Sequence, residues 1–135
     1  MLFKRPKITA WGNELDQRAA AGSGEVSNIA VKTVATDANY VLTVADMAGG
    51  AVQFTSWTAG RTITVPTAAL ILASAPDMDI GDSFANTISV VPAFAGTYVT
   101  ATGVTLAGRA TVPASSNTYV VITKTSATTV TWTVL

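Results

Sequence analysis

Short runs of alternating apolar and polar residues occupy most of the chain, which is the pattern of half-buried β-strands. The pattern is clearest in residues 118–134, where two alternating runs flank a turn at Ser126 and Ala127. Two such runs joined by a short turn predict a β-hairpin. A shift of one residue in the pairing would place Trp132 in water, so the register is well specified and Trp132 is expected in the core.

A single helix interrupts this β pattern. Pro66 ends the strand before it, because proline cannot donate to a sheet ladder. Thr67 is suited to cap a helix, since residues 68–75 are mostly good helix formers. Pro76 stops the helix. We therefore expect one short helix, at about residues 67–75.

Further short strands are expected at regular spacing, in residues 40–44, 52–56, 61–65, 84–91, 97–100, 104–106 and 110–112. The runs at 52–56 and 61–65 are close in sequence and joined through Gly60, so they are expected to pair as a hairpin. Many short strands separated by turns are typical of a β-sandwich or barrel. The expected fold class is all-β: an antiparallel β-sandwich or jelly-roll domain in residues 29–135.

Residues 1–28 differ from the rest of the chain. They hold half of its basic residues, show no sustained apolar period, and end in a flexible Gly-Ser-Gly joint at residues 22–24. Two interpretations are open: a disordered tail, or an extended N-terminal arm that docks on a neighbouring subunit. Trp11 would anchor such an arm, because buried Trp is a common interface hot spot. The candidate interface residues of the arm are Phe3, Lys4, Arg5, Lys7, Ile8 and Trp11.

Composition removes several classes of function. The chain contains no cysteine, which excludes disulfides and thiolate metal sites. It contains no histidine, so the commonest general base and the commonest transition-metal ligand are absent. The phosphate-binding and nucleophile motifs of common enzymes are absent too. We expect no enzymatic activity, and we assign no catalytic, cofactor-binding or metal-binding residue.

Charge and hydropathy limit the partners. The net charge is +0 and no basic stretch follows the first few residues, so nucleic acid is not an expected partner. The longest apolar run, residues 68–75, is far shorter than the ~20 residues that cross a bilayer, so no membrane partner is expected. Charged residues make up only 12 % of the chain, about half the usual share of a soluble domain.

One acidic loop has the residues for a calcium site. Asp77, Asp79 and Asp82 are spaced similarly to the oxygen ligands of a calcium-binding loop. However, Gly81 stands one place early for that motif and no glutamate closes it. The favoured interpretation is a solvated turn, since aspartate also suits turn geometry.

Four aromatic side chains could stack on sugars, namely Trp57, Tyr98, Tyr119 and Trp132. Such residues more often fill a core or a subunit interface. Trp57, beside a predicted turn, is the best candidate of the four for an exposed role.

An ordered set of motifs in residues 40–135 resembles one group of proteins. The motifs are TITVPTAALI, then IGDSF leading into a strand, then ATGVTLAG, then the terminal YVVITKTSATTVTWTVL hairpin. In this order they resemble the capsid decoration (cement) proteins and related head-fibre domains of tailed bacteriophages. Residues 1–28 have no counterpart in this order of motifs.

The resemblance implies a structural virion protein whose β-sandwich or jelly-roll domain assembles as a homotrimer. It implies a place on the outer capsid surface, in contact with the major capsid protein and with neighbouring decoration trimers, where the protein would stabilise the shell. Low charge suits a dense array in which each copy faces identical neighbours. The alternative is a tail-fibre or head-fibre module that recognises host surface glycans. An extended N-terminal arm favours the decoration protein, because an arm can reach across to neighbours.

Overall fold

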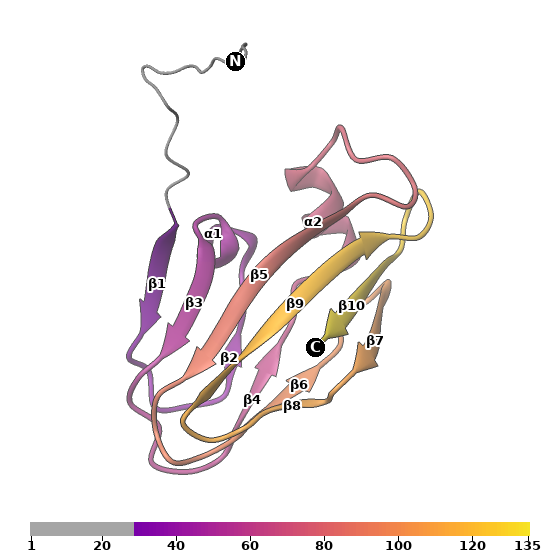
Figure 1. Ribbon diagram of the computed structural model, residues 1–135. Helices are drawn as coiled ribbons and strands as arrows, with labels where there is room; N and C mark the ends of the chain where they lie inside the picture. Colours follow the sequence, from indigo (N-terminus) through magenta and orange to yellow (C-terminus); the bar gives the residue numbers. More distant parts are fainter. Residues whose placement is uncertain (1–28) are drawn as a thin grey trace, which may run out of the picture.

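The computed structural model of the chain describes residues 29–135 (Figure 1). Within them the chain forms ten β-strands and two short helices. The first half contains β1 (Ala30–Val34), β2 (Tyr40–Val41), α1 (Val44–Met47), β3 (Gly50–Phe54), β4 (Arg61–Thr64) and α2 (Ala68–Ser74). The second half contains β5 (Ser83–Val90), β6 (Gly96–Val99), β7 (Val104–Gly108), β8 (Thr111–Val112), β9 (Ser116–Lys124) and β10 (Val130–Val134). Residues 1–28, for which an extended arm is expected, lie outside the described residues.

The strands form two mixed sheets. One sheet has six strands in the order β1-β3-β5-β9-β10-β7, and the other has four in the order β2-β4-β6-β8. From β1 to β9, successive strands alternate between the two sheets, and the smaller sheet lies behind the larger one in Figure 1. The chain therefore crosses twice between the layers before it returns to the same sheet.

The predominance of β-strands is confirmed, but the antiparallel arrangement expected from the sequence is wrong for most strand pairs. The pairs β1–β3, β3–β5, β2–β4, β4–β6 and β7–β10 are parallel. The pairs β5–β9, β9–β10 and β6–β8 are antiparallel. For β1, β3 and β5, and for β2, β4 and β6, the physical reason is the double crossing: the chain crosses to the other layer and back and resumes its original direction. β6 and β8, which are also two apart in sequence, pair antiparallel.

The hairpin predicted between residues 52–56 and 61–65 is also wrong. β3 and β4 lie in different sheets, and the residues between them carry the chain from one layer to the other. Trp57 in this crossing is buried, with its ring centroid 4.8 Å from that of Phe54. Gly96 of β6 leaves room for the Trp57 ring, since a Cβ there would lie 3.0 Å from Trp57 Cη2. Burying this large ring between the layers favours a crossing over a tight turn.

The predicted helix at about residues 67–75 is confirmed as α2. Its N-terminus is capped as expected, with Thr67 Oγ1 accepting a hydrogen bond from Leu70 N at 3.3 Å. The short helix α1 is not expected from the sequence, and it replaces the end of the strand predicted at residues 40–44. A capping box between Thr43 and Asp46 starts it, with two reciprocal hydrogen bonds of 3.1 Å.

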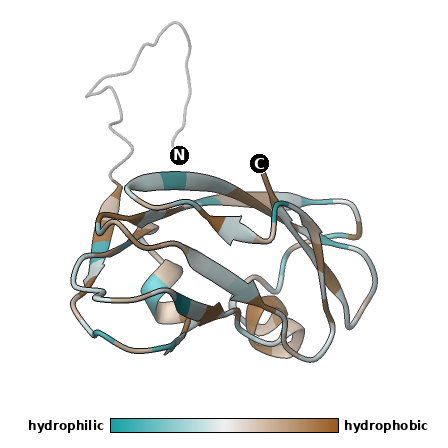
Figure 2. Cartoon of the chain, turned by 90° about the horizontal axis from the view of Figure 1, so that it is seen from below, coloured by the Kyte–Doolittle hydropathy of each residue, from teal (hydrophilic) through white to brown (hydrophobic). Residues whose placement is uncertain are grey.

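The C-terminal hairpin is confirmed, and it supplies much of the core. β9 and β10 pair antiparallel with Trp132 opposite Ile122, and both side chains are fully buried. They belong to one hydrophobic cluster that takes residues from both sheets, including Phe54 and Ile88 from the larger and Ile63, Tyr98 and Val112 from the smaller. Seen from below, the strands lie in two layers (Figure 2). The two sheets therefore share one core.

Candidate interaction surfaces

The first candidate surface is the outward side of the six-stranded sheet. Successive residues of a strand point to opposite sides of a sheet, so every second residue of these strands faces away from the core. The strand register aligns these outward residues in rows. The rows are Thr33–Gln53–Ser89–Asn117, Val31–Ala51–Thr87–Tyr119, Ala85–Val121–Thr133–Ala107 and Ser83–Thr123–Thr131–Thr105. We call this surface the outer sheet face, and no described helix covers it (Figure 1).

The outer sheet face carries no charged residue along any of its six strands. The two lysines on these strands occupy positions of the opposite side. Lys32 Nζ lies 3.6 Å from Asp46 Oδ1, and Lys124 Nζ donates a hydrogen bond to the carbonyl oxygen of Met78 at 2.8 Å. Depletion of charge is the compositional signature of the central part of protein interfaces. The face can therefore be buried against a partner without removing a charge from water.

One end of the outer sheet face carries side chains that suit a polar ligand rather than another protein surface. The Tyr119 side chain is 55 % exposed there. A hollow of about 310 Å³ near this end is lined by Val90 and Val91 and by the neutral polar residues Gln53, Ser89, Ser115, Ser116 and Asn117. An exposed aromatic ring next to neutral hydrogen-bonding groups suits a polar, uncharged ligand.

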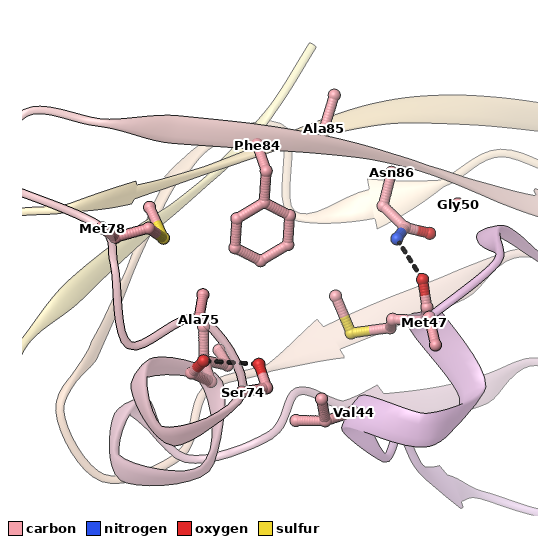
Figure 3. Close-up of a pocket in the computed structure, with 11 residues that line it drawn as sticks. Val44, Met47, Gly50, Ser74, Ala75, Met78, Phe84, Ala85 and Asn86 are labelled. Carbon is pink, nitrogen blue, oxygen red and sulfur yellow. Dashed lines mark hydrogen bonds between the residues drawn. The ribbon is translucent and has the colours of Figure 1, made fainter. Parts of the chain in front are cut away.

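The second candidate surface is an apolar hollow between the two helices and β5 (Figure 3), with a volume of about 440 Å³. Its walls are Val44 and Met47 of α1, Ile71 and Ser74 of α2, Ala75 and Met78 after α2, Phe84, Ala85 and Asn86 of β5, and Ala48 and Gly50. We call this the helix hollow. None of the described residues that line it is charged.

Asp46 fixes α1, which is one wall of the helix hollow. The carboxylate is only 6 % exposed, and its Oδ2 accepts hydrogen bonds from Tyr40 Oη at 2.9 Å and Thr43 N at 3.1 Å. Burial alone would raise the pKa of Asp46, but these hydrogen bonds and the nearby Lys32 outweigh it and hold the pKa below its ordinary value of 3.8. Burial and the same carboxylate raise the pKa of Tyr40. Asp46 is therefore charged and Tyr40 neutral near pH 7, which keeps the hydrogen bond between them in place.

Asn86 connects that wall to the sheet. Its Nδ2 donates a hydrogen bond to the carbonyl oxygen of Met47 at 2.9 Å, while its buried Oδ1 has no partner among the described residues. A buried polar group is costly unless it is hydrogen-bonded. The one side-chain hydrogen bond that Asn86 makes therefore ties the end of α1 to β5 across the hollow.

The structure describes only some of the predicted site residues. Phe3, Lys4, Arg5, Lys7, Ile8 and Trp11, the predicted interface residues of the arm, lie outside the described residues.

The four aromatic candidates are all described. Trp57, Tyr98 and Trp132 are buried, so the exposed role suggested for Trp57 is wrong and Tyr119 is the exposed ring. Tyr98 shares a buried hydrogen bond of 2.9 Å with Thr118, and burial raises the pKa of the Tyr98 hydroxyl. The strict alternation of β9 could have identified Tyr119 as exposed, because it lies on the side opposite Val120 and Ile122.

The acidic loop forms a turn. Among residues 29–135, no group of three histidine, cysteine, aspartate or glutamate residues is arranged to hold a metal ion, so Asp77, Asp79 and Asp82 make no such group. Asp82 Oδ2 accepts a hydrogen bond from Asp79 N at 2.9 Å. This local side-chain to backbone bond is typical of aspartate in turns.

Sequence reasoning missed both candidate surfaces. The alternation of each strand indicates which residues face outward, but the joining of those residues into one uncharged face depends on the strand order. The helix hollow had no sequence signal, because α1 itself is not predicted.

Comparison of the chain with known protein families, with curated proteins and with solved structures found no match in any of the three. None of the helices in the described part of the chain is both long enough and apolar enough to cross a membrane.

Proposed function

We propose that this chain is a structural virion protein, a capsid decoration (cement) protein that forms a homotrimer on the outer capsid surface. There it stabilises contacts between subunits of the major capsid protein and has no enzymatic activity. The order of motifs in residues 40–135 supports this proposal. The two sheets around a shared core are compatible with the β-sandwich that the resemblance implies.

The uncharged outer sheet face is the observation that carries the proposal. A protein that packs against copies of itself must bury part of its surface, and a charge buried without a partner costs several kcal/mol. The outer sheet face avoids that cost across six strands, and its small Ser, Thr and Ala side chains let another flat surface approach closely. We assign it to the contact between subunits of the trimer.

Residues 1–28 supply the attachment to the capsid in this proposal. Phe3 and Ile8 would provide apolar contact area, and Lys4, Arg5 and Lys7 a smaller contribution that depends on salt.

An antibody against this chain tests the proposal on purified phage particles that encode it. A decoration protein gives label at regular positions over the whole shell. Particles from a strain in which the coding sequence is deleted are the control. Absence of label from intact particles would contradict any role on the virion surface.

The fibre module that recognises glycans is the second candidate, and Tyr119 beside the polar hollow favours it. It predicts antibody label on fibres and binding of the purified protein to a glycan array. The variant Tyr119→Ala should then lose binding. Phe94→Ala, which removes another exposed aromatic ring in a loop, should keep it. A protein that binds no glycan and labels the shell excludes this candidate.

A further inference from the structure

The helix hollow has the lining of a site for an aromatic side chain. Met47, Met78 and Phe84 line it (Figure 3), and so does Ile71 of α2. Methionine side chains adapt to the shape of a partner, and their sulfur atoms make favourable contacts with aromatic rings. Because the lining contributed by residues 29–135 holds no charged side chain, an apolar ring could enter the hollow without separating an ion pair there.

The hollow lies where the chain enters the folded domain. Gly50 lines it, and Ile29 Cγ2 lies 3.8 Å from the position that a Cβ on Gly50 would take. Ala30 N also donates a hydrogen bond to the carbonyl oxygen of Gly49 at 3.0 Å. Figure 1 shows the start of β1 at the same end of the molecule as both helices. Residues 1–28 are therefore tethered at the rim of the hollow.

Trp11 is the best matched apolar residue of this tethered segment. The other large apolar side chains of residues 1–28 are Met1, Leu2, Phe3, Ile8, Leu15 and Val26. Trp11 is the largest of them, and of the two aromatic residues it is the closer in sequence to Ile29. The link from residue 11 to residue 29 reaches at most about 60 Å when fully extended, so it can return to the rim with slack. A short flexible linker gives an effective concentration in about the millimolar range, which falls as a linker lengthens, so the covalent link to Ile29 favours an occupant from the same chain.

We propose that the side chain of Trp11 occupies the helix hollow of its own chain. The ring packs between the two methionines and against Phe84. This docking fixes the base of the arm and leaves residues 1–10, with Phe3, Lys4, Arg5, Lys7 and Ile8, at the helix-bearing end of the domain. The inference concerns this chain by itself and holds whether or not the proposed place on a capsid is correct.

Disulfide trapping in the full-length chain tests the proposal, because the natural sequence has no cysteine. The variant Ala10→Cys/Ser74→Cys places one thiol beside Trp11 and the other at the exposed Ser74 in the wall of the hollow. In the control, Ala10→Cys/Thr97→Cys, the second thiol is at an exposed position of β6, which lies in the smaller sheet and does not line the hollow. In dilute solution the first pair should form an intrachain disulfide at least about tenfold faster than the control pair. Adding Trp11→Ala should reduce its rate to that of the control.

Each other outcome of the trapping experiment overturns the proposal. Equal rates in the two pairs would show that Trp11 does not hold the arm in the hollow. A disulfide between two chains that depends on protein concentration would make a neighbouring copy the occupant of the hollow.

Methionine methyl signals give a second readout without any cysteine. Of the three methionines, Met47 and Met78 line the hollow. With ¹³C-methyl methionine in the full-length chain, Trp11→Ala should shift both of their signals, since it removes the ring current of the indole. The matched variant Phe3→Ala should leave both in place. Unchanged Met47 and Met78 signals in Trp11→Ala would overturn the proposal.

Discussion

Arg61 Nη2 donates a hydrogen bond of 2.7 Å to Asp37 Oδ1, and this ion pair joins two crossings of the chain between the sheets. Asp37 lies between β1 and β2, and Arg61 begins β4. The same carboxylate accepts hydrogen bonds from Thr58 N at 3.0 Å and Thr58 Oγ1 at 2.6 Å. One aspartate therefore holds the connection that precedes β2 against the connection that precedes β4.

The Asp37 cluster predicts a pH-dependent contribution to stability. The hydrogen bonds from Thr58 and Arg61 lower the pKa of Asp37 from 3.8 to about 2. Because the folded pKa is the lower one, the contribution is complete above about pH 4 and is lost as the pH falls towards about 2. Asp37→Asn should lower the melting temperature near neutral pH, and its difference from the natural protein should shrink as the pH falls to about 2 and disappear below that pH. Thermal unfolding of both proteins across this range measures the difference.

The other carboxylates, Asp46 among them, are present in both proteins. The difference in melting temperature between the two proteins therefore reports the contribution of Asp37 alone. Since the cluster is exposed, added salt should reduce the difference near neutral pH. A difference that stays constant from neutral pH to about pH 2 would show that the charge of Asp37 does not contribute to stability.

The truncation of Trp132 tests the core. Trp132 is fully buried at the centre of the shared cluster. Trp132→Ala should therefore cost about 3–5 kcal/mol in the free energy of unfolding, the range for removing a large buried aromatic side chain. Urea unfolding at one fixed protein concentration measures this cost, because self-association would add to the apparent stability. The control Phe94→Ala, in an exposed loop, should cost less than about 1 kcal/mol. A loss for Trp132→Ala as small as that of the control would contradict the register of β10.

The parts of the fold that sequence predicts are those fixed by local chemistry. Strict alternation around Trp132 permits one register, and the prolines and the Thr67 cap around α2 act over a few residues. The pairing of β3 and β4 could not be predicted in this way. A short connection that contains glycine suits a hairpin. It crosses between the sheets because Trp57 packs against Phe54 and against Gly96, and Gly96 is distant in the sequence.

For the candidate surfaces, too, the sequence predicts the local features but not those that depend on distant contacts. Periodicity correctly indicates that Val121 and Thr133 face away from Val120 and Trp132, but it does not indicate which strands lie side by side. Lys32 shows why exposure along one strand does not identify the outer sheet face. Most residues of β1 are exposed, yet the Lys32 side chain lies on the opposite side of the sheet and its charge pairs with Asp46. Only the strand order shows that the outward positions together form an uncharged face.

A single charge in the outer sheet face tests the proposed trimer. Sedimentation equilibrium of the natural protein at micromolar concentration should give a homotrimer. Thr131 lies in this face between Thr123 of β9 and Thr105 of β7. Thr131→Glu should weaken association by roughly a hundredfold or more, since unpaired or like charges in a contact cost several kcal/mol.

The matched control for this variant is Thr97→Glu. It makes the same chemical change at an exposed residue of β6, in the smaller sheet, and should leave association unchanged. A natural protein that is monomeric at micromolar concentration would contradict the trimer. Equal weakening by the two variants would show that the outer sheet face is not the specific contact.

Deletion of residues 1–28 should separate folding from attachment. The hydrophobic cluster is built from residues of the described domain, from Val34 to Val134, so residues 29–135 should keep a cooperative unfolding transition. An arm that becomes ordered on binding loses about 1–2 kcal/mol of conformational entropy for each residue that is fixed. It must recover this by burying apolar side chains, and in residues 1–10 these are mainly Phe3 and Ile8.

The experiment adds natural and truncated protein to capsid shells that lack the protein, and measures the bound fraction after sedimentation. The truncated form should bind less at every concentration. Phe3→Ala/Ile8→Ala in the full-length chain should reproduce most of that loss at any salt concentration, because it removes apolar contact area. Lys4→Ala/Arg5→Ala/Lys7→Ala should reproduce a smaller part that disappears at high salt, since exposed charges contribute little and are screened. Equal binding by the natural and truncated forms would exclude the arm as an anchor, and attachment would then depend on surfaces of the folded domain alone.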